Sequence, residues 1–323
     1  MKKISLLLLL MAMAVCKLCI CGCVSGDDGA SAKDATILAD KIIKQIRQGK
    51  NISLKDKHIL GVLDFTKVSP SNKKLNVSTS YVPSEICFVD CVFHDSVITY
   101  RDIPDSRCSV VSVFDKNVCF QNCQFSSDLV MRQTDFRGRF DFDLCRVNGN
   151  SDFSGSHFST GISFCQANFD GDAMFVSCNF YGRANFFKVF FRNSLVMQYV
   201  RFNDIAMFSD AHFYGVVDMS KMFAASTVDF ANSKFSGGFS LTNSQFLGDL
   251  RLVACQFSDK ASLLNNQLVG LLNLRKAQFL CNTTIIDNVL YTEPDSRDCI
   301  KADSVDIIQQ NNKTVNLIVK QII

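Results

Sequence analysis

Large apolar side chains recur along most of the chain at alternating steps of five and six residues. Within 151–180, phenylalanine stands at 153, 158, 164, 169, 175 and 180. Neither the two-residue period of a strand nor the 3.6-residue period of a helix produces this spacing. Continued in both directions, the alternation defines 33 positions between 114 and 290: 21 Phe, six Leu, three Met, one Val, one Ile and Ala224, which has Phe223 beside it.

The residues between these positions indicate short strands joined by corners. The residue two before a large position is usually small or apolar, as at Ser156, Ala167 and Cys178. In extended chain, residues two apart share a face, so both are expected to point inward. Ser, Gly, Asn and Asp fill the remaining positions and favour turns. One such unit cannot bury its own apolar face, and stacked coils are therefore predicted.

Four units of five, six, five and six residues give a coil of 22 residues, and 114–290 then makes about eight coils. The predicted fold class is an all-β solenoid with phenylalanine rings along its axis. A three-sided β-helix of the pectate-lyase type has coils of similar length and remains the alternative. Left-handed hexapeptide helices are excluded, because they need steps of six throughout.

The repeats resemble the pentapeptide-repeat family, which has Phe or Leu at the central inward position and a small residue two before it. The resemblance implies a right-handed, four-sided parallel β-helix. It covers 114–290 strongly and 52–98 in patches. The sixth residue in alternate units departs from the plain five-residue repeat and is similar to a phenylalanine-rich variant of the family.

Residues 33–50 are predicted to form an amphipathic helix. Leu38, Ile42 and Ile46 share one face, and Gly49 suits the helix exit. This helix is expected to cap the first coil, because the open edge of a solenoid must be protected from pairing with other chains.

The region 52–113 is predicted to form irregular first coils. It contains two expected loops, 66–84 and 99–112, which hold three of the four prolines. Residues 291–323 are expected to form a C-terminal cap or tail that includes a last strand. The five- and six-residue spacing first appears at Leu54, Ile59 and Phe65.

Residues 1–22 read as a secretory signal peptide, with two lysines, an apolar run and a lipobox-like end before Cys23. Lipidation of Cys23 is expected, followed by a tether over 23–32. Cys16, Cys19 and Cys21 are rival processing sites. The predicted location is therefore an exported lipoprotein, anchored to a membrane of the bacterial cell envelope on its periplasmic or cell-surface side.

Charge limits the partners. Residues 1–22 contain three lysines and no acid, so removing them leaves 31 of the 34 basic residues against 31 acidic ones. A near-neutral protein lacks the basic surface that nucleic acids require, and no nucleic-acid partner is expected. The best-known members of the resembling family mimic duplex DNA, which needs an acidic rod in the cytoplasm.

The cysteines are expected to be structural. Cys87/Cys91 and Cys119/Cys123 share a C-x3-C spacing, but the members of each pair should face opposite ways, so no metal is predicted. Cys123 and Cys145 should stack in neighbouring coils, and a disulfide between them is left open. Five cysteines take the small inward position and should be buried: Cys91, Cys123, Cys145, Cys178 and Cys255.

No catalytic residue, cofactor or enzymatic activity is predicted. The sequence has four histidines and no motif that joins one of them to a base, a nucleophile or a phosphate-binding loop. His157 and His212 each directly precede a large inward position and should face solvent.

One surface feature suggests binding. A candidate patch consists of Phe187, Lys188, Phe190, Arg192 and Tyr214, because outward aromatics beside arginine are enriched in interfaces. The predicted function is a non-enzymatic scaffold or binding module for an envelope protein or polysaccharide. The alternative is a β-helix protein that acts on or binds polysaccharide, and a homodimer stays open.

Overall fold

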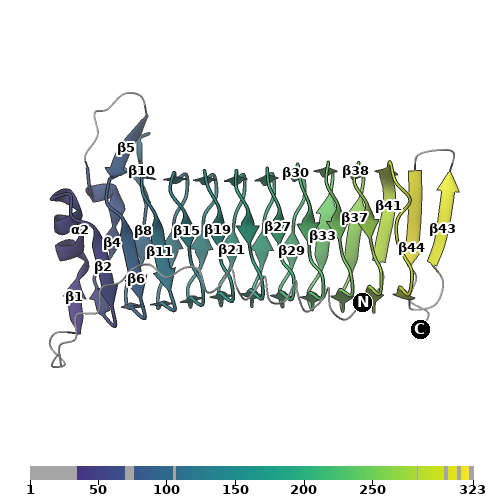
Figure 1. Ribbon diagram of the computed structural model, residues 1–323, viewed down its shortest axis with the longest axis horizontal. Helices are drawn as coiled ribbons and strands as arrows, with labels where there is room; N and C mark the ends of the chain where they lie inside the picture. Colours follow the sequence, from purple (N-terminus) through teal and green to yellow (C-terminus); the bar gives the residue numbers. More distant parts are fainter. Residues whose placement is uncertain are drawn as a thin grey trace, which may run out of the picture. The chain divides into compact units, whose positions relative to one another are not determined.

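The computed structural model describes residues 35–69, 76–104, 107–281, 283–301, 305–310 and 314–319. The chain divides into two units, Met1–Ala35 and Thr36–Ile323. The signal peptide, Cys23 and the tether, predicted within 1–32, lie outside the described residues. The second unit is a parallel β-solenoid of about 11 coils with almost no helix (Figure 1), so the predicted solenoid is confirmed.

Each regular coil contributes four short strands, and equivalent strands of successive coils pair in parallel, which builds four ladders. Ladder 1 contains β1 (Thr36–Leu38), β3 (His58–Leu60), β7 (Val92–Phe93), β12 (Gln124–Phe125), β16 (Arg146–Val147), β20 (Asn168–Phe169), β24 (Phe190–Phe191), β28 (His212–Phe213), β32 (Lys234–Phe235), β36 (Gln256–Phe257), β40 (Gln278–Phe279) and β42 (Ile300–Lys301). Ladder 2 contains β2 (Ile52–Lys55), β6 (Ile86–Val89), β11 (Val118–Gln121), β15 (Phe140–Asp141), β19 (Ile162–Ser163), β23 (Ala184–Asn185), β27 (Ala206–Met207), β31 (Val228–Asp229), β35 (Leu250–Arg251) and β39 (Leu272–Asn273).

The other two ladders are joined in one sheet. Ladder 3 contains β4 (Leu63–Asp64), β8 (Val97–Ile98), β13 (Leu129–Val130), β17 (Ser151–Asp152), β21 (Ala173–Met174), β25 (Leu195–Val196), β29 (Val217–Asp218), β33 (Phe239–Thr242), β37 (Ala261–Leu264) and β41 (Thr283–Leu290). Ladder 4 contains β5 (Val77–Val82), β10 (Ser109–Phe114), β14 (Asp135–Phe136), β18 (His157–Phe158), β22 (Asn179–Phe180), β26 (Arg201–Phe202), β30 (Phe223–Ala224), β34 (Gln245–Phe246) and β38 (Gln267–Leu268).

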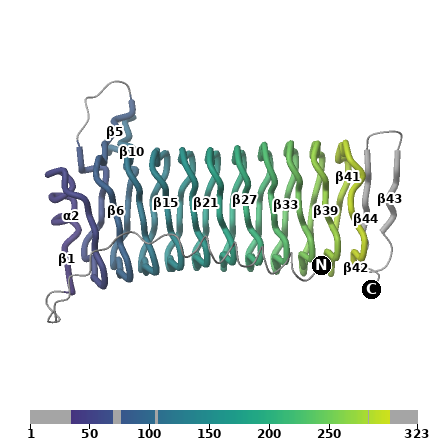
Figure 2. Tube along the Cα trace, in the orientation of Figure 1, coloured from purple at the N-terminus to yellow at the C-terminus, as the bar shows by residue number. Residues whose placement is uncertain are grey.

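From Phe114 onward the coils stack with a constant offset of 22 residues. Phe136 is paired with Phe158, and Phe158 with Phe180, in ladder 4. The same offset appears in the other ladders, for example between Phe169 and Phe191 in ladder 1. Figure 2 shows the coils following one another in chain order. This register places each side chain above its equivalent in the next coil.

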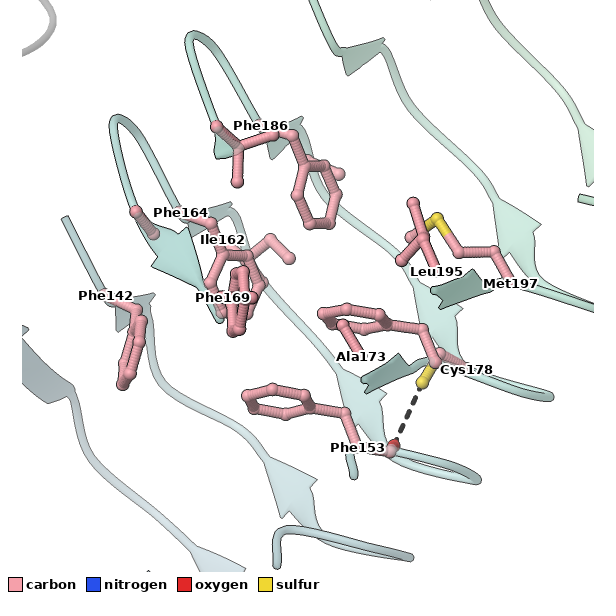
Figure 3. Close-up of a cluster of buried hydrophobic side chains, with 14 of the residues drawn as sticks. Phe142, Phe153, Ile162, Phe164, Phe169, Ala173, Cys178, Phe186, Leu195 and Met197 are labelled. Carbon is pink, nitrogen blue, oxygen red and sulfur yellow. Dashed lines mark hydrogen bonds between the residues drawn. The ribbon is translucent and has the colours of Figure 1, made fainter. Parts of the chain in front are cut away.

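The large apolar positions fill the interior. From Phe114 to Ile285 every one of them is at most 2% exposed, and Leu290 is half-buried. Phe164 stacks on Phe186 with ring centroids 5.1 Å apart, and Phe186 stacks on Phe208 at 4.6 Å. Figure 3 shows these rings between the strands, with the Cys178 thiol donating a hydrogen bond to the Phe153 carbonyl at 3.0 Å. Each buried ring contributes about 1.5–3 kcal/mol to folding.

The five-residue steps contain a tight turn with a left-handed residue. In the turn from Phe153 to Ser156, the Ser156 N–H donates to the Phe153 carbonyl at 3.0 Å, and Gly155 has a φ of 73°. Eighteen non-glycine residues have such a φ, and from Asn122 to Asp298 the left-handed positions recur every 11 residues. Asn and Asp, which tolerate this conformation best, hold nine of the 18. The left-handed turn therefore occurs twice per coil and accounts for the shorter steps.

Several of the longer steps carry glycine for a different reason. A Cβ placed on Gly171 would lie 2.4 Å from the carbonyl oxygen of Gly149, its equivalent in the preceding coil. No side chain fits at that distance unless the backbone moves. At these turns, glycine lets the backbones of successive coils come close together.

Ala224 keeps the inward position that its size seems poorly suited to fill. It pairs with Phe202 and Phe246 in ladder 4 and is fully buried, whereas Phe223 points outward. Two residues earlier, where most units have a small residue, Met222 is also buried. The large and small side chains have exchanged places, so the coil keeps its apolar volume.

We therefore expect Met222 and Ala224 to be coupled. Ala224→Phe alone should overpack the core and cost about 1–3 kcal/mol of unfolding free energy. Met222→Ala alone should cost about 2–5 kcal/mol because it leaves a cavity. The double variant restores the usual order of small then large, and its cost should fall well below the sum of the two. Denaturant unfolding measures all three, and additive costs would contradict the exchange.

The predicted N-terminal helix is shorter than expected. The helix α2 spans Ala39–Arg47, and residues 36–38 form β1, which pairs in parallel with β3. Leu38 has extended backbone angles and is 61% exposed, so its assignment to the apolar helix face was wrong. Hydrogen bonding to the sheet edge takes precedence over helical periodicity there.

The rest of the helix follows the prediction. Ile42, Ile43 and Ile46 join the same buried cluster as the first coils. At the C-terminus, Gly49 has a φ of 73° and its N–H donates to the Ile46 carbonyl at 2.8 Å. The Lys50 N–H donates to the Gln45 carbonyl at 3.1 Å, which completes a Schellman motif.

The two expected loops are largely strands. Residues 66–84 contain the end of the short 3₁₀ helix η1 (Phe65–Lys67) and the strand β5, and residues 99–112 contain β9 (Tyr100–Asp102) and most of β10. β5 pairs with β10 in parallel, and β9 pairs with it antiparallel. Long-range pairing of β-branched residues, which the prolines obscured, explains the difference.

Beyond Leu290 the strands change direction. β43 (Val305–Gln310) and β44 (Thr314–Val319) form an antiparallel pair, and β44 also pairs antiparallel with β41. The strand expected near the C-terminus corresponds to β44.

Candidate binding surface

Three of the five predicted patch residues come together on the outward face of ladder 1. Phe190 lies on β24, and Arg192 and Tyr214 directly follow β24 and β28. Phe190 contacts His212 with ring centroids 5.1 Å apart, and the His212 and Tyr214 centroids are 6.2 Å apart. The Arg192 guanidinium carbon lies 5.7 Å from the centre of the Tyr214 ring.

Asp170 holds the charged part of this surface. Its carboxylate accepts a hydrogen bond from Arg146 Nε at 2.8 Å on one side and forms an ion pair with Arg192 Nε at 3.1 Å on the other. Arg192 Nε also donates to Asn168 Oδ1 at 3.2 Å. Exposed ion pairs add little stability, about 0–1 kcal/mol, so their main effect here is to orient the guanidinium groups. We call Asp170, Phe190, Arg192, His212 and Tyr214 the ladder-1 cluster.

Phe187 and Lys188 lie apart from this cluster. Phe187 follows β23 of ladder 2, and Lys188 occupies the left-handed position of the next turn, with a φ of 54°. Lys188 Nζ lies 5.1 Å from the centre of the Phe187 ring. Val189, between these residues and β24, is fully buried. The turn therefore divides the predicted patch into a pair beside ladder 2 and a cluster on ladder 1.

His212 is a member of the cluster that sequence reasoning assigned to a solvated wall. It is half-buried. Burial lowers the pKa of its imidazole, and the nearby Lys234 ammonium lowers it further, while Asp210 acts in the opposite direction. The ring is therefore neutral at pH 7, which suits its place between two aromatic rings.

A second aromatic and cationic surface lies beside ladder 4. The Arg201 guanidinium carbon is 4.7 Å from the centre of the Phe223 ring. Lys221 Nζ is 4.8 Å from the centre of the Tyr199 ring and donates to the Tyr199 hydroxyl at 2.7 Å. Sequence reasoning missed both pairs. The usable signal is the 22-residue separation, which also relates Phe190 to His212 and Arg192 to Tyr214.

The inward cysteines are buried, as predicted. Cys91, Cys123 and Cys145 form one column, and the Cys123 N–H donates to Cys145 Sγ at 3.4 Å. The thiols of Cys123 and Cys145 are free, so the disulfide that the sequence left open is not formed. Hydrogen bonding to Cys145, together with burial, raises the pKa of Cys123, and hydrogen bonding to Cys123 does the same for Cys91. Such thiols are poor nucleophiles near neutral pH.

Other groups were considered for chemistry. His58 Nδ1 and His94 Nε2 lie 2.9 Å apart at the surface of the first coils. Across the parts of the chain that the structure describes, no three His, Cys, Asp or Glu residues are arranged to hold a metal ion. Neither helix in the described ranges has the length and apolar character needed to cross a membrane.

Comparison with known proteins supports the repeat. The comparisons with curated proteins and with solved structures gave no significant match. A family model described as pentapeptide repeats, with nine copies, matches residues 175–222, which include most of the ladder-1 cluster. This stretch is therefore a run of pentapeptide repeats, and the pentapeptide-repeat family is the one that the comparisons support for this chain.

Proposed function

We propose that this protein is a non-enzymatic binding module whose β-solenoid presents a fixed surface to a protein or polysaccharide of the cell envelope. The observation that carries the proposal is the ladder-1 cluster. Its aromatic rings and ion pairs are held on three successive coils, whose interiors are filled by apolar side chains. Aromatic residues beside arginine are typical of recognition surfaces.

A binding assay tests this proposal. The purified protein is sedimented with washed envelope fragments of its source organism. Tyr214→Ser should reduce the retained fraction several-fold, because it removes the exposed ring beneath Arg192. The matched control is Tyr181→Ser, since Tyr181 is equally exposed but lies beside ladder 4. Equal retention of both variants and the parent protein would argue against the cluster as the contact surface.

We propose that the module is exported and tethered by a lipid on Cys23. The support is the basic and apolar character of residues 1–22 and the small residue before Cys23. Labelling with a radioactive fatty acid should mark the parent protein, and globomycin should block its processing. Cys23→Ala should abolish the label. Label that persists in this variant but disappears on substitution of Cys16, Cys19 or Cys21 would move the site.

Two finer features of the fold belong to the same proposal. Four parallel ladders favour a right-handed coil of four sides over the three-sided alternative. We also propose that α2 caps the N-terminal edge, since its buried isoleucines share the core of the first coils.

A further inference from the structure

We propose that the ladder-1 cluster, together with Arg146 and Lys234, binds an acidic polysaccharide whose carboxylates lie along the ladder. The inference rests on the proposed binding function and names the chemical class of its partner. It depends on the charge, the geometry and the spacing of the outward side chains between β16 and β32.

Positive charge predominates on the outward strand positions of this stretch. Arg146, Arg192 and Lys234 are cations, and Asp170 is the one carboxylate on these positions between Arg146 and Ser236. Two further carboxylates, Asp172 and Asp210, lie at the flanking turns, so the cations form a strip along the middle of the ladder. A local strip of this kind in a nearly neutral protein favours an anionic ligand.

The guanidinium groups are oriented toward a ligand. Arg146 and Arg192 both contact Asp170 through Nε, and their side chains are 52% and 49% exposed. Within the described structure, the two terminal nitrogens of each group remain for a further acceptor. Arginine binds carboxylates through two parallel hydrogen bonds, and Asp170 limits the motion that such binding would have to arrest.

The aromatic side chains supply the apolar half of a sugar site. Tyr214 is 44% exposed, and Phe190 and His212 lie half-buried next to it. Such rings pack against the C–H faces of pyranose sugars while the Tyr hydroxyl stays available for a hydrogen bond. The neutral state of His212 leaves this floor uncharged at pH 7.

The spacing distinguishes a polysaccharide from an acidic protein segment. Arg146, Arg192 and Lys234 stand on β16, beside β24 and on β32, which is one cation on every second coil. At about 4.8 Å per strand, the cations follow one another at about 10 Å. A polysaccharide with one carboxylate per disaccharide carries charge at a comparable interval. An extended peptide presents side chains on one face about every 7 Å, which does not match.

Binding of hyaluronan oligosaccharides, which carry one carboxylate per disaccharide, tests the inference by calorimetry with the intact protein. Neutral dextran and poly-L-glutamate serve as comparison ligands. We expect saturable binding of hyaluronan that weakens as salt is raised. Arg192→Gln and Tyr214→Ser should each weaken it at least tenfold. The matched control, Arg251→Gln, removes an equally exposed arginine from ladder 2 and should change affinity less than twofold.

Each other outcome overturns the inference. Equal weakening by Arg192→Gln and Arg251→Gln would mean nonspecific attraction to net charge. Poly-L-glutamate binding as tightly as hyaluronan would mean an acidic protein partner, and absence of hyaluronan binding would remove the acidic-polysaccharide class. If envelope fragments still distinguish Tyr214→Ser from Tyr181→Ser in that case, the binding module stands and only its ligand class is wrong. Thermal unfolding of every variant excludes loss of fold as the cause.

Discussion

Replacing Phe186 with alanine should lower the free energy of unfolding by about 3–5 kcal/mol. The ring is fully buried and stacks between Phe164 and Phe208, at 5.1 and 4.6 Å. It also makes edge contacts with Phe175 and Phe180. Removing it leaves a ring-sized gap in the middle of a column, where the neighbouring strands are hydrogen-bonded and cannot close in. Guanidinium unfolding followed by circular dichroism measures the loss.

The adjacent residue provides the control for this experiment. Phe187 differs from Phe186 by one position but is outward and packs only partly, against Lys188. Phe187→Ala should therefore cost no more than about 1 kcal/mol. Similar losses in the two variants would mean that the inward assignment of the five- and six-residue positions is wrong.

Replacing Gly171 with alanine should cost about 1–3 kcal/mol, although only one methyl group is added. That methyl would lie 2.4 Å from the Gly149 carbonyl oxygen and 2.8 Å from Asn150 Oδ1. Both atoms belong to the preceding coil, and Asn150 Oδ1 already accepts the Asp172 N–H at 3.0 Å. Relief therefore requires the two coils to separate at this turn. The change in the denaturation midpoint reports the cost.

Gly161→Ala is the matched substitution and should have the opposite sign. The nearest atom to its added methyl is the Arg183 carbonyl oxygen at 3.5 Å, which is an ordinary contact. Alanine also reduces the freedom of the unfolded chain, so stability should stay unchanged or rise by up to about 1 kcal/mol. A loss at Gly161 as large as that at Gly171 would show that close approach between coils is not the cause.

The interior of the solenoid could be predicted from the sequence because one large side chain marks every strand. Burial at a fixed phase is enough to identify the inward face, and even Ala224 occupies the expected place. What the large residues do not encode is the compensation by Met222, which depends on summed volume within a coil. The identity of the left-handed turn residues gives a weak signal, because Leu144 and Tyr199 occupy positions where Asn or Asp is easier to accommodate.

The ends and the surface were harder to predict for physical reasons. Residues 36–38 have helical periodicity with the segment that follows, but a sheet edge offers them hydrogen bonds that no local pattern reveals. β5 and β10 meet across an insertion, so their pairing depends on contacts distant in sequence. The predicted patch grouped Phe187 with Phe190 by closeness in sequence. Proximity on a solenoid surface follows the coil repeat instead, which brought His212 to Phe190.

The register between coils also governs how the length of such a chain can change. Loss or duplication of 22 residues removes or adds one complete turn, and every downstream strand still meets an equivalent partner. A deletion of any other size within the regular region moves large side chains out of phase with the core. Extra residues are tolerated where the chain departs from and returns to a single bend, as between η1 and β5. Growth by whole turns lengthens the ligand-facing strip without altering its chemistry.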